Sequence, residues 1–211
     1  MGVRDTQKAA TREKVLSAAR DLFHEIGYDE TTIRAIADRA GVSVGSVFTT
    51  FSSKADVLSQ VMADRVEPLQ EELTRVLPYL RGSTCDRLCS IFAIHYDFEC
   101  RRVKLFLAHI AASYSPSLEE TTTPFGRNAS FQAMLRETLT DGITRGDVHP
   151  EADLDLILQL LIAAYAWNYS LAAQLGADAG ALTARMDRQI ELIMNGARHP
   201  VGAAGAQLAT Q

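Results

Sequence analysis

The chain has 211 residues, 47% of them hydrophobic and 22% charged, which is typical of a folded globular protein with one large or two modest domains. Its formal net charge of −5 excludes a uniformly basic protein that coats nucleic acid. Residues 1–54 hold 8 of the 21 Lys and Arg and 7 of the 26 Asp and Glu, so they carry +1 and the remainder −6. This distribution suits a chain that contacts phosphate only through its amino-terminal part.

Three cysteines, Cys85, Cys89 and Cys100, contain no C-x-x-C pair, so no disulfide framework is expected and a reducing cytoplasm fits. Buried small residues are favoured over a redox or metal sensor, which the pattern leaves open. The chain begins without the hydrophobic segment of a secretion signal. Its longest apolar run, Leu160–Trp167, is far shorter than the roughly 20 residues of a membrane span. We therefore expect a cytoplasmic protein that does not enter a membrane.

The apolar residues recur at helical spacing along the whole chain, which predicts an all-α fold. Residues 1–10 are expected to form a mobile arm, and Thr11 to begin a helix that ends at Gly27. A long helix is predicted from Ser53 to Val76, with a kink near Asp64 because Pro68 lies inside it. One or two further helices are predicted in 84–115, before a surface loop at 115–127. After this loop, helices are predicted around Phe131–Ile143 and at 153–175 and 179–195.

Residues 31–54 predict a helix-turn-helix. The first short helix has one apolar face at i, i+3, i+4 and i+7, formed by Ile33, Ile36, Ala37 and Ala40. Gly41 then allows the left-handed turn that ends this helix, and Ser43 can cap the next one. Val47 faces the small core, so the second helix presents small side chains that can enter a major groove.

The start of the following helix resembles a capping box, with Ser53 as N-cap and Asp56 three residues later. Lys54 then lies at a helix amino terminus. Its ammonium and the backbone N–H groups there could contact one phosphate together.

These motifs resemble the TetR family of bacterial regulators. The shared pattern is T-x-x-x-I-A-x-x-A-G-V-S (residues 32–43), then F-x-S-K (51–54), preceded by F-x-x-x-G-Y (23–28). Two positions depart from the family, which usually has Tyr where this chain has Phe48 and commonly His in place of Thr50. The missing Tyr hydroxyl removes one phosphate hydrogen bond that the resemblance would otherwise imply.

The resemblance implies three parts: a DNA-binding head at 1–53, a helical ligand-binding and dimerisation body at 54–198, and a disordered tail at 199–211. It implies a homodimeric repressor that a small molecule releases from a palindromic double-stranded operator. Val44, Ser46 and Thr49 would read base edges, while Thr32, Phe48 and Lys54 would contact the DNA backbone; simple helix capping remains an equal alternative for Thr32. The complete candidate set is Thr32, Ser43, Val44, Gly45, Ser46, Phe48, Thr49, Thr50 and Lys54.

The resemblance also implies an effector cavity in the body. Aromatic and polar residues inside the predicted helices provide apolar lining with a few hydrogen-bonding groups, which suits an apolar or amphipathic small molecule. The candidates are Phe92, His95, Tyr96, Phe106, His109, Phe131, Tyr165, Trp167 and Asn168, and core packing is an equal alternative for each. The helices at 153–175 and 179–195 are the expected dimer interface, because their apolar stripes exceed what one neighbour covers.

No catalytic motif supports an enzyme, since the chain has no nucleophile elbow, phosphate-binding glycine loop or H-E-x-x-H. No cofactor and no metal is expected. The main rival is a helical small-molecule-binding or interaction protein without DNA recognition, suggested by Phe48 and Thr50. A helical enzyme that uses His95 or His109 is a weaker alternative.

Overall fold

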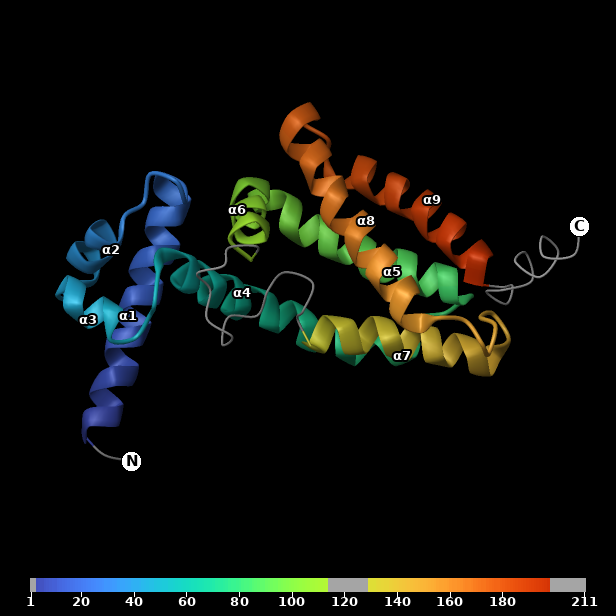
Figure 1. The fold of residues 1–211 in the computed structure, drawn as a ribbon, viewed down its shortest axis with the longest axis horizontal. Helices are drawn as coiled ribbons and strands as arrows, with labels where there is room; N and C mark the ends of the chain where they lie inside the picture. Colours follow the sequence, from blue (N-terminus) through green and yellow to red (C-terminus); the bar gives the residue numbers. More distant parts are fainter. Residues whose placement is uncertain (1–2, 114–128, 198–211) are drawn as a thin grey trace, which may run out of the picture. The chain divides into compact units, whose positions relative to one another are not determined.

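The computed structural model describes residues 3–113 and 129–197, and all regular elements within these ranges are helices (Figure 1). The all-α prediction is therefore confirmed. The chain divides into two compact units, one drawn from residues 1–69 and 104–125 and the other from 70–103 and 126–211. Residues 54–69 thus group with the amino-terminal helices, and the functional division after residue 53 stays a prediction. The predicted loop at 115–127 and tail at 199–211 lie outside the described residues.

The first unit contains α1 (Val3–Glu25), α2 (Ile33–Ala40), α3 (Val44–Phe48), the beginning of α4 (Lys54–Val76) and most of α6 (Val103–Ser113). Helices α1, α2 and α3 pack on one another around a small apolar core that includes Val15, Leu16, Ala19, Phe23, Ile36, Ala37 and Val47. The predicted arm at 1–10 is wrong for the described residues, because α1 already begins at Val3. Gln, Lys and Ala at positions 7–10 are good helix formers and extend it.

The turns between these helices follow the sequence signals closely. Gly41 has φ 67° and its N–H donates to the carbonyls of Ala37 and Asp38, so α2 ends where the pattern predicts. The hydroxyl of Ser53 accepts from the N–H of Asp56 at 3.1 Å, as an N-cap should. The Asp56 carboxylate, however, accepts from the N–H of Ser52 at 2.9 Å, one residue before the partner that a capping box requires.

Helix α4 is a single helix from Lys54 to Val76, as predicted, with the exposed Pro68 inside it. Proline has no N–H, so the carbonyl of Asp64 lacks its usual helical donor. The boundary between the two compact units lies just after this proline, between Leu69 and Gln70. The kink itself stays a prediction. A short 3₁₀ helix, η1 (Leu77–Tyr79), follows α4.

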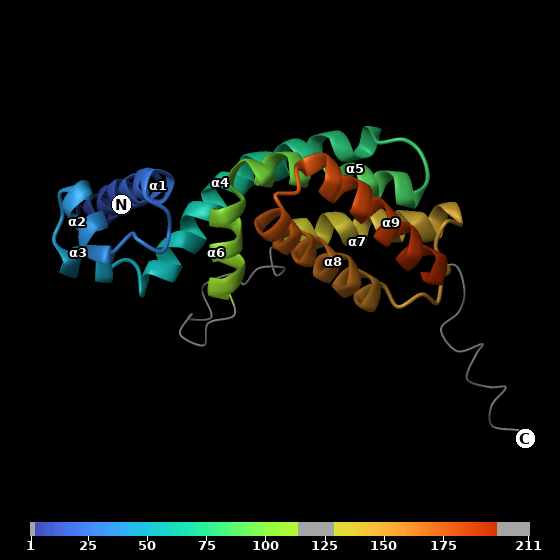
Figure 2. The same ribbon diagram turned by 90° about the horizontal axis from the view of Figure 1, so that it is seen from above.

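The second unit is a helical bundle (Figure 2) of α5 (Thr84–Glu99), η2 (Cys100–Arg102), α7 (Ala129–Arg145), α8 (Leu154–Leu175) and α9 (Ala179–Ala197). Helix α9 packs along α5 and α8, and α7 packs against both α5 and α8. The helical content predicted for 84–115 is confirmed as α5 and α6, separated by η2.

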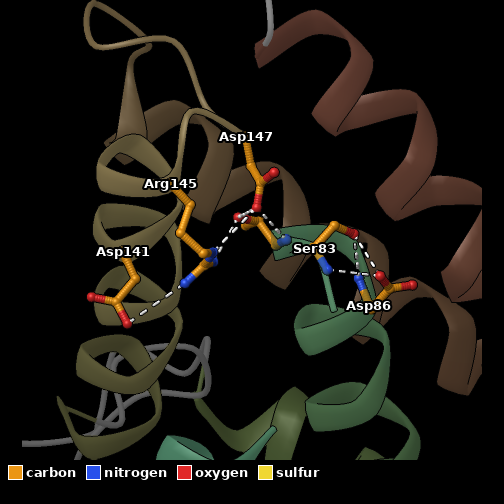
Figure 3. A network of polar contacts seen from close by, with 6 residues as sticks. Ser83, Asp86, Asp141, Arg145 and Asp147 are labelled. Atoms are coloured by element: carbon orange, nitrogen blue, oxygen red, sulfur yellow. Dashed lines mark hydrogen bonds and ion pairs between the residues drawn. The ribbon is translucent and has the colours of Figure 1, made fainter. Parts of the chain in front are cut away.

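A polar joint fixes the start of α5 to the end of α7 (Figure 3). The Asp147 carboxylate accepts from the N–H of Thr84 at 2.9 Å and from its hydroxyl at 3.0 Å. Arg145 donates to the Thr84 hydroxyl at 3.0 Å and to Asp147 at 3.3 Å. Burial alone would raise the pKa of Asp147, but these donors hold it below its ordinary value. Ser83 and Asp86 form a reciprocal capping box at the same helix start.

Helix α8 is long and apolar enough to cross a membrane by length and composition, with a mean hydropathy of 1.4. A core helix of a bundle meets the same criteria, and α8 packs against α7 and α9. Its buried face includes Ile157, Leu158, Leu161, Tyr165, Asn168 and Tyr169. Packing in the bundle thus accounts for the apolar residues on this buried face of α8.

Candidate DNA-binding surface and effector site

Helix α3 is anchored by one side chain and presents the others outward. Val47 is fully buried against the first unit's core. The remaining small residues form what we call the recognition face: Ser43, Val44, Gly45, Ser46 and Thr49, all exposed except the half-buried Ser46. The structure therefore brings together the residues that the sequence predicted for the major groove.

The hydroxyl groups of the recognition face are held in place by the helix itself. The Ser43 hydroxyl accepts from the N–H of Ser46 at 3.0 Å and lies 2.8 Å from the Ser46 hydroxyl. One hydrogen occupies the space between the two oxygens, so the other hydroxyl hydrogen can point outward. Thr49 donates to the carbonyl of Ser46 at 2.7 Å, which leaves its oxygen as an exposed acceptor. The face thus presents a donor and an acceptor in fixed positions.

Three further candidates lie beside this face. Thr32 is exposed and its hydroxyl accepts from the N–H of Ala35 at 3.0 Å, so the capping alternative is confirmed and a phosphate contact stays a prediction. Phe48 is 53% exposed, although it is a large apolar side chain. The Thr50 hydroxyl is buried and has no hydrogen-bond partner among the residues that the structure describes.

Lys54 has a role that the sequence did not indicate. Its ammonium donates to the carbonyls of Tyr28 at 2.8 Å, Thr31 at 2.9 Å and Asp29 at 3.2 Å. It also lies 4.3 Å from the centre of the Tyr28 ring. Because a lysine has three N–H donors, these bonds use all of them. Lys54 therefore clasps the turn between α1 and α2, and its phosphate contact stays a prediction.

Arg34 is an exposed cation that the sequence-based candidate set omitted. It lies in the first turn of α2, two residues after Thr32. Arg39 on the same helix differs, because it donates to both carboxylate oxygens of Glu25 at 3.0 and 2.8 Å and lowers the pKa of that group. The sequence could have indicated Arg34, because it is a charged residue between Ile33 and Ile36 of the predicted apolar face.

The second unit contains a buried group of rings that we call the aromatic cluster. Its members are Phe92, His95 and Tyr96 on α5, Phe131 on α7, and Tyr165 and Tyr169 on α8. The ring centres lie 4.4 Å apart for His95 and Phe131, 5.3 Å for Phe92 and Tyr165, and 5.1 Å for Tyr96 and Tyr165. Every member is buried. Five predicted effector residues thus meet here.

Most polar atoms of this region bond to one another. Asn168 donates to the Tyr96 hydroxyl at 2.9 Å and to Gln189 at 2.7 Å, and Tyr169 donates to the Tyr165 hydroxyl at 3.1 Å. Two buried atoms differ: within the described ranges, His95 Nε2 and Asn168 Oδ1 have no hydrogen-bond partner. Burial lowers the pKa of His95 to about 4, so its imidazole is neutral at pH 7.

Phe106 and His109 lie on α6, most of which groups with the first unit, and their role in an effector site stays a prediction. Trp167 is 65% exposed, so its predicted place in a cavity lining does not fit. The reason is helical rotation, because Tyr165, Asn168 and Tyr169 share one face of α8 and residue 167 points away from it.

Trp167 belongs instead to an apolar strip on the opposite face of α8, which we call the outer stripe. It consists of Leu156, Leu160, Ala163 and Trp167, spaced at i, i+4, i+7 and i+11. Leu156 and Leu160 are 46% and 47% exposed, whereas the neighbouring Leu161 is fully buried. On α9, Leu192 is 73% exposed. Both helices predicted for a dimer interface thus present large apolar side chains.

Cys89 and Cys100 lack the environment of a reactive thiol. Burial and a hydrogen bond with Asp187 raise the pKa of Cys89 to about 12, and burial also raises the pKa of Cys100. A sensing thiol needs a lowered pKa. Within the described ranges, no group of three or more His, Cys, Asp or Glu is placed to hold a metal.

Residues 15–61 match the family described as bacterial regulatory proteins of the tetR family. The matched segment covers α2, α3, the carboxy-terminal part of α1 and the start of α4. It therefore includes the whole recognition face and Lys54.

Curated relatives extend this similarity. The transcriptional repressor KstR2 of Mycolicibacterium smegmatis is 26% identical over 157 residues, which are 74% of this chain and 76% of that protein. The transcriptional regulator SrpR of Pseudomonas putida is 33% identical over 85 residues, 40% of each chain.

Solved structures share the fold over nearly the whole chain. FadR of Thermus thermophilus, a TetR-family repressor in complex with lauroyl-CoA, matches with a TM-score of 0.71 and 24% identity, over 88% of this chain and 94% of that one. FadR of Bacillus subtilis, in complex with stearoyl-CoA, matches with a TM-score of 0.68 and 19% identity, over 87% and 98%.

Proposed function

Because this chain belongs to the TetR family of bacterial regulatory proteins and is a DNA-binding transcriptional regulator, we propose that it is a cytoplasmic, homodimeric repressor. Its recognition face would enter the major groove, with Val44, Ser46 and Thr49 at the base edges. The observation that carries this proposal is the anchoring of α3 by the buried Val47, which leaves the small side chains of the recognition face on the outside. Small side chains allow the helix to approach the bases closely.

The groups around the recognition face would position it on the DNA backbone. The hydroxyl of Thr32 retains a hydrogen for a phosphate oxygen, and the exposed Arg34 adds a charge close by. Phe48 can contribute apolar contact but no hydrogen bond. Lys54 would act mainly by holding the turn at Tyr28 to Thr31, on which the placement of α2 depends.

A dimer would form through α8 and α9, with the outer stripe of one copy against that of the other. Ala163 lies between Leu160 and Trp167 and lets the two helix backbones approach. A two-fold dimer would place two heads on half-sites about one helical turn apart or slightly more, which predicts a near-palindromic operator.

Selection from a random double-stranded DNA pool at physiological salt tests the DNA-binding proposal directly. The full chain is expected to enrich one near-palindromic site. Ser46→Ala is expected to change the preferred bases within each half-site, whereas His24→Gln, an exposed change on α1, should leave the site unchanged. If the folded wild-type protein enriches no sequence, DNA recognition by this face is contradicted and the rival without DNA recognition gains support.

For the effector, we propose an acyl thioester whose apolar part occupies the aromatic cluster. Two arguments support this class: the cluster is apolar with few polar groups, and two proteins of the same fold bind fatty acyl-CoA. Lauroyl-CoA and stearoyl-CoA are expected to lower operator affinity about 5- to 150-fold, the range of a typical allosteric coupling. Coenzyme A alone is the matched control. Unchanged operator affinity with both thioesters would remove this effector class.

A further inference from the structure

His95 differs from every other polar member of the aromatic cluster. The hydroxyls of Tyr96, Tyr165 and Tyr169 bond to protein groups. His95 is only 4% exposed, yet no described residue offers a hydrogen bond to its Nε2. Buried polar groups are nearly always paired, because an unpaired one loses its hydration without compensation. A partner from outside the chain would restore the balance.

The surroundings of His95 limit what that partner can be. Its ring centre lies 4.4 Å from that of Phe131 and 6.0 Å from that of Tyr165, and Phe131 in turn lies 5.8 Å from Phe92. These rings come from α5, α7 and α8. The part of an effector that lies against these rings must therefore be apolar apart from the atom that bonds to Nε2. A pure packing role at this position would be served better by a side chain without nitrogen.

We propose that His95 Nε2 is the polar recognition group of the effector site, and that it hydrogen-bonds an uncharged oxygen, a carbonyl or hydroxyl, next to the apolar part of the effector. The inference rests on the proposed effector site in the aromatic cluster and specifies how that site selects its ligand. The apolar part of the effector packs on the rings of Phe92, Phe131 and Tyr165.

The charge of the site distinguishes effector classes. Because burial keeps His95 neutral at pH 7, its imidazole supplies no positive charge to balance a buried carboxylate. A free fatty acid is a carboxylate at pH 7, so it would have to take up a proton and become neutral in order to enter. The site therefore prefers a neutral acyl derivative, such as a thioester, over the corresponding acid.

Calorimetric titration of the full-length protein with lauroyl-CoA and with laurate tests the inference. The wild type is expected to bind lauroyl-CoA at least about tenfold more tightly than laurate. His95→Phe should weaken binding of lauroyl-CoA about tenfold, and His95→Gln, which keeps a hydrogen-bonding group, should lose less. His24→Gln is the matched control on an exposed histidine and should bind as the wild type does. Thermal unfolding of each variant establishes that it is folded.

A second measurement reads the hydrogen bond itself in the unmutated protein. In a sample with 15N-labelled histidine, the Nε2 resonance of His95 is expected to shift when lauroyl-CoA is added, while that of His24 stays fixed. Equal affinity of the wild type and His95→Phe, or an unmoved Nε2 resonance on saturation, overturns the role of His95 and leaves the effector class intact. Absence of lauroyl-CoA binding by both the wild type and His24→Gln overturns the proposed effector class and this inference together.

Discussion

The recognition face and the aromatic cluster place their polar groups in opposite ways. On α3 the hydroxyls of Ser43, Ser46 and Thr49 lie at the surface, and each is oriented by backbone or side-chain groups within three residues. In the cluster, polar atoms are buried and bond across helices, as Asn168 and Tyr96 do from α8 and α5. The surface proposed to read DNA can thus be built locally, whereas the proposed effector site needs the complete bundle.

The largest expected effect comes from comparing a substitution on the buried face of α8 with one on its exposed face. Leu161→Glu places a charge at a fully buried position and should cost roughly 4 kcal/mol or more of the free energy of unfolding. Leu160→Glu, at a 47% exposed position of the outer stripe, should leave the fold intact but produce monomers in sedimentation experiments. A dimeric Leu160→Glu protein would place the interface elsewhere.

Lys54→Met should destabilise the first unit by about 2 kcal/mol, because it removes three hydrogen bonds and keeps most of the side-chain stem. Denaturant unfolding measures this change. The salt dependence of DNA binding separates the clasp from a phosphate contact: the slope falls by about 1 per head only if Lys54 also neutralises a phosphate. Unaltered stability would show that the clasp contributes nothing.

Acid should weaken the second unit through His95. Its pKa is about 4 in the folded protein and 6.5 ordinarily, so the unfolded chain binds more protons between these values. The contribution of His95 to the free energy of unfolding is therefore fully present above pH 6.5 and decreases as the pH falls toward 4. About 2 kcal/mol of it is lost between pH 7.5 and 5. Thermal unfolding across this range should show a shallower pH dependence for His95→Phe than for His24→Gln. Identical profiles would contradict a buried, neutral His95.

Phe48→Tyr should have the smallest effect. The side chain is 53% exposed at the end of α3, so a hydroxyl added there can reach a phosphate without disturbing the core. Operator affinity should rise about three- to tenfold, which corresponds to one hydrogen bond. Fluorescence anisotropy with labelled operator measures the change, and equal affinities would show that this residue does not face the DNA backbone.

The same contrast explains what the sequence could predict. Gly41 and Ser43 act through bonds to residues three or four positions away, so their types and spacing predicted the end of α2 and the start of α3. The clasp formed by Lys54 joins residues 23 to 26 positions apart and leaves no local pattern. The early start of α1 at Val3 was missed because residues 3–10 lack an apolar stripe, although they favour helix.

In the second unit, composition predicted the kinds of residues but not their directions. Five predicted aromatic and histidine side chains meet in one cluster. Trp167 does not, since which face of α8 turns inward is decided by packing against α7 and α9. Nothing in the sequence indicated that His95 Nε2 lacks a partner among the described residues, because this depends on the packing of helices distant in sequence.

The clasp also has a consequence for dividing the protein. A head fragment ending at residue 53 would keep the whole recognition face but lose the ammonium that holds the carbonyls of Tyr28, Asp29 and Thr31. Transplanting the DNA specificity of this chain onto another regulator therefore requires a junction within α4, beyond Lys54. A junction after Leu69, where the chain passes from the first unit to the second, keeps the recognition face together with the Lys54 clasp.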